Sequence, residues 1–112
     1  MSIKSAVVGI YVSRQEAEEA LQIFHKHGFG KKIFSFQRHS LKIFILDADV
    51  EKVSKNELFS HLNISRQTEK KYSALLKNGK SLLVAYGTPY EVKLAKEIID
   101  HTRVSETNIH PA

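Results

Sequence analysis

The chain lacks cysteine entirely, so it offers no disulfide, no thiolate nucleophile and no cysteine ligand for zinc. No apolar run approaches the ~20 residues that a membrane helix needs. The apolar stretch at residues 5–12 is followed by charged residues and not by a small-residue cleavage site, which predicts a strand and not a signal peptide. We therefore expect a cytoplasmic protein without a membrane segment.

Acidic residues are missing from residues 22–46, although the formal net charge of +5 is modest. This segment holds five cations: Lys26, Lys31, Lys32, Arg38 and Lys42. A second basic run, residues 66–80, carries five cations against Glu69 alone. Basic segments can attract nucleic acid or small anions. A solvated, lysine-rich surface is the simpler interpretation, and we favour it.

Residues 81–100 predict a short strand, a sharp turn and an amphipathic helix. Residues 82–86 are apolar and too few for anything longer than a buried strand. Thr88 is a suitable N-cap, Pro89 fits the first helical position, and Glu91 completes a capping box. Apolar residues at helical spacing give the helix one buried face: Val92, Ala95, Ile98 and Ile99.

A similar unit occurs 75 residues earlier. Three pairs align at that offset: Tyr11 with Tyr86, Ser13 with Thr88, and Glu16 with Glu91. Residues 7–11 form the first expected strand, and residues 14–27 form the helix that follows it. Each helix precedes another candidate strand, residues 32–36 and residues 104–109. Two strand–helix–strand units predict the split β-α-β arrangement of ferredoxin-like folds.

Between these units we expect residues 41–46 to form a strand, which can pair with residues 32–36 in a hairpin. This hairpin either joins the main sheet or covers a dimer interface. Ser54 starts a capping box before a short helix at residues 58–62, and Ser65 caps a longer helix at residues 66–78. The predicted fold is α+β, a ferredoxin-like split β-α-β sandwich with an antiparallel sheet and extra helices inserted between the two units. One domain spans residues 1–112, with units at about 5–46 and 81–110 and a helical insertion at about 50–78.

Motifs that resemble catalytic or metal sites fail on spacing. Gly79, Lys80 and Ser81 follow a helix and open a strand, the reverse of a phosphate-binding P-loop. Residues 28–30 have glycines like those of an RNA-binding strand but lack its stacking aromatic residue. The six histidines show no pair at i, i+4 spacing with a nearby carboxylate cluster. We therefore expect no metal, no cofactor and no enzymatic activity.

The two strand-to-helix turns remain as candidates, each of them a small-anion site by itself. Tyr11, Ser13 and Arg14 belong to the first turn, and Tyr86 and Thr88 belong to the second. Helix N-termini present unsatisfied N–H groups, which can bind a small anion such as a phosphate or a carboxylate. Plain helix capping explains the same residues, so this site is a hypothesis.

A resemblance to a known family lies in residues 6–21, 28–29, 62–65 and 79–84, in Tyr72 and Leu75, and in the closing helix. In these segments the chain resembles the bacterial general stress (heat-induced stress) protein domains. It implies a bacterial, cytoplasmic, non-enzymatic protein of ferredoxin-like type and no site residues.

Two functional classes follow. We favour a non-enzymatic stress-related or regulatory module that forms a homodimer and binds a small anionic ligand at its helix N-termini. The alternative is a nucleic-acid-binding protein that uses the basic segment from Lys26 to Lys42.

Overall fold

The computed structural model describes residues 5–26, 41–48, 59, 62 and 64–111. It has four strands and three helices in this part of the chain: β1 (Ser5–Tyr11), α1 (Arg14–Lys26), β2 (Lys42–Leu46), α3 (Arg66–Lys77), β3 (Ser81–Gly87), α4 (Pro89–Asp100) and β4 (Glu106–His110). Within the described residues, no helix is long and apolar enough to cross a membrane.

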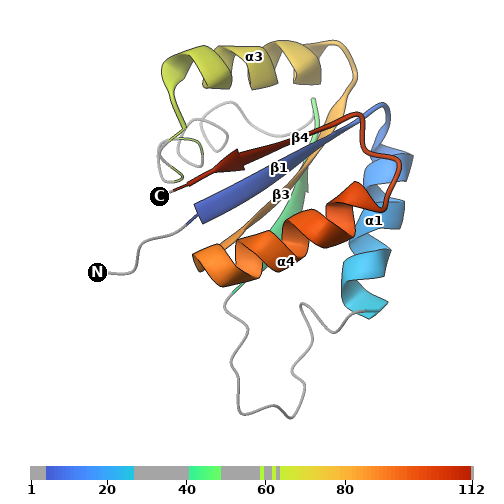
Figure 1. Ribbon diagram of the computed structural model, residues 1–112. Helices are drawn as coiled ribbons and strands as arrows, with labels where there is room; N and C mark the ends of the chain where they lie inside the picture. Colours follow the sequence, from blue (N-terminus) through green and yellow to red (C-terminus); the bar gives the residue numbers. More distant parts are fainter. Residues whose placement is uncertain (1–4, 27–40, 49–58, 60–61, 63, 112) are drawn as a thin grey trace.

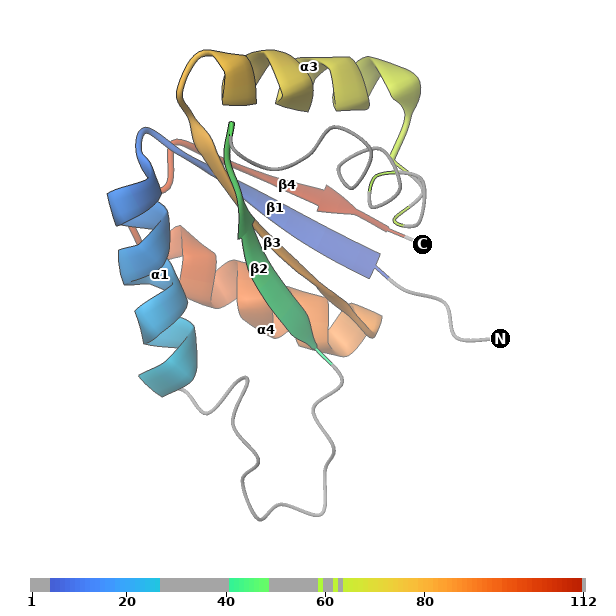
Figure 2. The ribbon, with the colours of Figure 1, turned by 180° about the vertical axis from the view of Figure 1, so that it is seen from behind.

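The strands form one antiparallel sheet in the order β2-β3-β1-β4. β3 lies between β1 and β2, and β1 lies between β3 and β4. Each strand–helix–strand unit is therefore split by a strand of the other unit. This arrangement confirms the predicted α+β class and is compatible with the ferredoxin-like split β-α-β fold. Because β2 pairs with β3, residues 42–46 belong to the main sheet (Figure 2).

Helices cover both faces of the sheet. α1 and α4 lie on one face, and α3 lies on the other, where Phe59 and Leu62 are also buried (Figure 1). β1 is buried along its whole length because its alternate side chains enter two separate cores. Val7 and Leu83 pack under α1 and α4, whereas Val8 and Val84 pack under α3. Because both faces of β1 and β3 are buried, the sequences of these strands are nearly continuous apolar runs.

The helices begin where the sequence predicts them. Ser65 caps α3, and Thr88 caps α4 through a complete capping box, with Pro89 as the first helical residue. On α3, Tyr72 and Leu76 are buried against the sheet, and Leu75 is partly buried beside them. The predicted strand at residues 32–36 and the predicted cap at Ser54 lie outside the described residues.

The alignment of Tyr11 with Tyr86 is wrong. Tyr11 packs under α1 and α4, whereas Tyr86 packs against the core on the α3 face. One residue separates the end of β1 from Ser13, but Thr88 follows the end of β3 directly. Because side chains alternate along a strand, this difference of one residue moves a tyrosine to the opposite face. The structural counterpart of Tyr11 is Gly87.

Candidate functional site

The two turns lie at opposite ends of the sheet. In the antiparallel register, Tyr11 pairs with Ser81, and Gly87 pairs with Ser5. Six residue steps separate these pairs, which corresponds to roughly 20 Å along the strands. The five predicted site residues therefore form two separate groups and do not make one site.

At the first turn, Tyr11 connects β1 to the end of α4. Its side chain is fully buried, and its hydroxyl lies 2.7 Å from Thr102 Oγ1. Thr102 in turn donates to the carbonyl oxygen of Ile99, so Tyr11 is the donor in the first bond. Burial raises the pKa of Tyr11 above its ordinary value. This tyrosine has a structural role in the described part of the chain.

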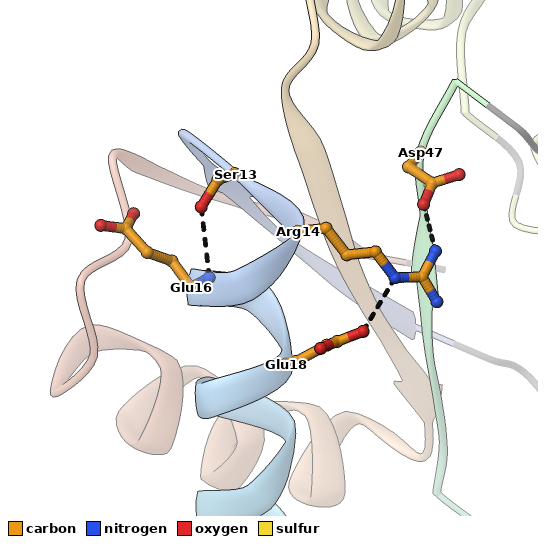
Figure 3. A network of polar contacts seen from close by, with 5 residues as sticks. All are labelled: Ser13, Arg14, Glu16, Glu18 and Asp47. Carbon is orange, nitrogen blue, oxygen red and sulfur yellow. Dashed lines mark hydrogen bonds and ion pairs between the residues drawn. The ribbon is translucent and has the colours of Figure 1, made fainter.

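Ser13 and Arg14 begin α1 (Figure 3). Ser13 Oγ accepts a hydrogen bond from the Glu16 amide at 3.4 Å, as an N-cap does, while the Glu16 side chain extends away from it. Arg14 Nε donates to Glu18 Oε1 at 2.8 Å, and a terminal guanidinium nitrogen donates to Asp47 Oδ2. These bonds raise the pKa of Arg14. The guanidinium thus links α1 to the residue after β2.

A shallow groove of about 500 Å³ runs beside this ion pair, between α1 and β2. Leu21, Ile43 and Ile45 supply its apolar lining, and Arg14 and Glu18 lie at its polar side. A second cleft of about 300 Å³ lies between α1 and residues 101–103. The lining of this second cleft includes Glu16, Glu19 and His101. It also includes Thr102, whose hydroxyl is already bonded to Tyr11 and to the carbonyl oxygen of Ile99.

At the second turn, the chain's own carboxylate occupies the N-terminus of α4. Glu91 Oε1 accepts hydrogen bonds from the Thr88 amide at 3.1 Å and from the Thr88 hydroxyl at 2.9 Å. Its other oxygen accepts from the Leu41 amide at 3.1 Å. Glu91 is only 7% exposed. An anion at this turn would have to displace a buried carboxylate that already has hydrogen-bond partners.

Gly87 makes the close approach of these groups possible. A Cβ atom at this position would lie 3.0 Å from Glu91 Oε1 and 3.2 Å from the Leu41 Cα. Tyr86, the neighbouring predicted site residue, is half-buried on the opposite face. Its ring makes an edge-on contact with Phe44, with centroids 5.9 Å apart.

Two residues of the basic alternative lie in the described part of the chain. Lys26 ends α1 and Lys42 begins β2, and both are exposed. Lys31, Lys32 and Arg38 lie outside the described residues. The structure therefore does not test whether the five cations form one surface.

A polar cluster between α3 and β4 was not predicted from the sequence. The Tyr72 hydroxyl lies 2.6 Å from His110 Nε2, and the two rings meet edge to face at 5.7 Å. Burial raises the pKa of Tyr72 to about 12, against a smaller opposing effect of the Asn108 side chain, and burial lowers the pKa of His110. Beside them, Lys71 Nζ lies 2.7 Å from Glu106 Oε2. The sequence feature that could have indicated this cluster is the alternation of side chains along β4, which places residues 106, 108 and 110 on one face.

Among the described residues, no three histidine, aspartate or glutamate side chains are grouped as metal ligands. Comparison with known protein families, with curated proteins and with solved structures gave no match. The resemblance to general stress proteins therefore stays a prediction from the sequence.

Proposed function

We propose that this chain is a non-enzymatic module, stress-related or regulatory, that associates with a second copy of itself along β4. One observation carries the proposal: β4 is the last strand at one end of the described sheet, and Ile109 on it is 44% exposed. An edge strand presents unpaired backbone groups that another chain can bind, and an exposed apolar side chain adds area to bury.

The two faces of β4 differ in a way that favours this edge. Glu106 and His110 project toward α3 and are engaged with Lys71 and Tyr72. Ile109 pairs with Val7 and thus lies on the opposite face, beside α4. The α3 face of the strand is held within its own chain, and Ile109 is the apolar group that a second chain would cover.

We expect the two copies of β4 to be related by a two-fold axis. Most homodimers have a two-fold axis, so that one patch contacts its own copy. Two antiparallel β4 strands centred on Asn108 would place Ile109 of each chain opposite Thr107 of the other. The two four-stranded sheets would then form one sheet of eight strands.

Polar contacts at the predicted site support a role other than catalysis. Tyr11, Arg14 and Thr88 bond to other side chains of the same chain and thereby fix helix ends. A small anionic ligand at these turns stays a prediction, and at α4 it requires release of Glu91. The cytoplasmic and bacterial setting is likewise proposed from the sequence.

Sedimentation velocity across a hundredfold concentration range tests the proposal. We expect the wild-type chain to form a dimer and Ile109→Lys to shift it toward the monomer, because lysine on an edge strand disfavours pairing. Val12→Lys is the matched control, since Val12 is 54% exposed but lies in the turn before α1. A monomeric wild type, or equal dimerisation of both variants, would overturn association along β4.

A further inference from the structure

The outward face of α3 carries a row of cations. Arg66, Lys70 and Lys77 are all exposed, and their spacings of four and seven residues place them on one side of the helix. The row extends roughly 16 Å, at 1.5 Å of rise per residue. The single acid of α3, Glu69, is partly buried and lies off this row.

These three cations differ from their neighbour Lys71. Lys71 pairs with Glu106 on β4 at 2.7 Å. Among the ion pairs of the described residues, none involves Arg66, Lys70 or Lys77. α3 lies on the face of the sheet opposite α1 and α4 (Figure 1). The row is therefore available to an anionic partner.

We propose that the row Arg66, Lys70 and Lys77 binds the phosphate backbone of a nucleic-acid duplex. A duplex carries one phosphate charge per ~1.7 Å of its axis, so a row of this length spans several phosphates. Lysine and arginine on a helix make backbone contacts of this kind without reading sequence.

The other side chains on α3 favour a nucleic-acid duplex over a single strand or a membrane surface as the partner. Proteins that bind single strands stack the bases on aromatic side chains, but the aromatic residue of α3, Tyr72, is buried toward the sheet. Helices that lie on membranes insert an apolar face. The apolar residues Leu75 and Leu76 also pack toward the sheet. The outward face thus offers charge without stacking or insertion.

Fluorescence anisotropy with a labelled 20-base-pair DNA duplex tests the inference. Three phosphate contacts predict an affinity that falls about 40-fold between 50 and 200 mM salt. The variant R66Q/K70Q/K77Q should lose most of this salt dependence and bind at least ~10-fold more weakly at 50 mM salt. Glutamine preserves helix propensity, so α3 should remain folded, which circular dichroism checks.

The control variant K26Q/K42Q/K93Q removes three exposed cations outside α3 and gives the same net charge. We expect it to retain most of the wild-type affinity. An equal or larger loss in this control would overturn the inference, since it would mean that net charge or the segment near Lys26 and Lys42 dominates. Tighter binding to a single strand of the same length, or to anionic vesicles without duplex binding, would also overturn it.

Discussion

The Glu91 carboxylate accepts a hydrogen bond from the Leu41 backbone amide, 50 residues earlier in the chain, at 3.1 Å. Its other oxygen caps α4 through Thr88. One buried side chain therefore ties the start of α4 to the residue before β2. The turn before α4, which the sequence offers as an anion site, is therefore occupied by the carboxylate of Glu91.

Replacement of Glu91 by alanine should destabilise the protein by about 2–3 kcal/mol. The change removes half of a capping box and leaves the Leu41 amide without its carboxylate acceptor. Glu91→Gln keeps one amide oxygen and should lose less. Glu97→Ala, exposed on the same helix, is the control and should change the free energy of unfolding little. Urea denaturation gives these values, and a Glu91→Ala variant as stable as the control would contradict this role.

Gly87→Ala should also destabilise the protein, by about 1–3 kcal/mol, because the new methyl group overlaps Glu91 Oε1 and the Leu41 backbone. Gly79→Asn is a useful comparison. Gly79 has a φ of +85° and no atom within 4 Å of an added Cβ, and asparagine tolerates that conformation. We expect Gly79→Asn to be the milder change in thermal unfolding. The opposite order would show that the space beside Gly87 is not restricted.

His110 should make stability depend on pH. Burial lowers its pKa below 6.5, so the unfolded chain binds the proton at a higher pH than the folded chain does. The stability that neutral His110 provides is therefore complete above about pH 6.5 and is lost as the pH falls through its folded pKa. The free energy of unfolding, measured from pH 8 to pH 5, should decrease, and His110→Gln should decrease less. Identical slopes for the two proteins would refute this linkage.

Tyr72→Phe tests the partner of His110. The substitution removes the hydroxyl and keeps the ring under α3, so we expect a loss of about 1 kcal/mol. Tyr90→Phe is the matched control, because Tyr90 is 69% exposed. Chemical denaturation at pH 7.5 measures both. Equal effects of the two changes would argue against a stabilising bond between Tyr72 and His110.

Local features of the fold follow from the sequence. Capping residues such as Ser65 and Thr88 mark the starts of helices, and the apolar periodicity identifies their buried faces. The repeat indicates two strand–helix–strand units, which is enough to predict an antiparallel sheet of the observed class. These signals act over a few residues and are visible in one chain.

Contacts between distant segments could not be predicted in this way. The repeat aligned Tyr11 with Tyr86 because the two turns have similar sequences. However, the turn before Thr88 is one residue shorter than the turn before Ser13, so the two tyrosines lie on opposite faces of the sheet. The bond from Leu41 to Glu91 joins groups that no spacing relates. The pairing of Tyr72 with His110 likewise depends on where α3 crosses the sheet. The positions of the two candidate turns were likewise not predictable, since strand direction places them at opposite ends of the sheet.

Native mass spectrometry of gently purified protein decides whether the chain associates with itself. We expect a species of about 25 kDa, twice the 12.7 kDa of one chain, without additional bound mass. The Ile109→Lys variant should give mainly the single-chain mass under the same conditions. A wild-type chain that remains monomeric at tens of micromolar would contradict the account.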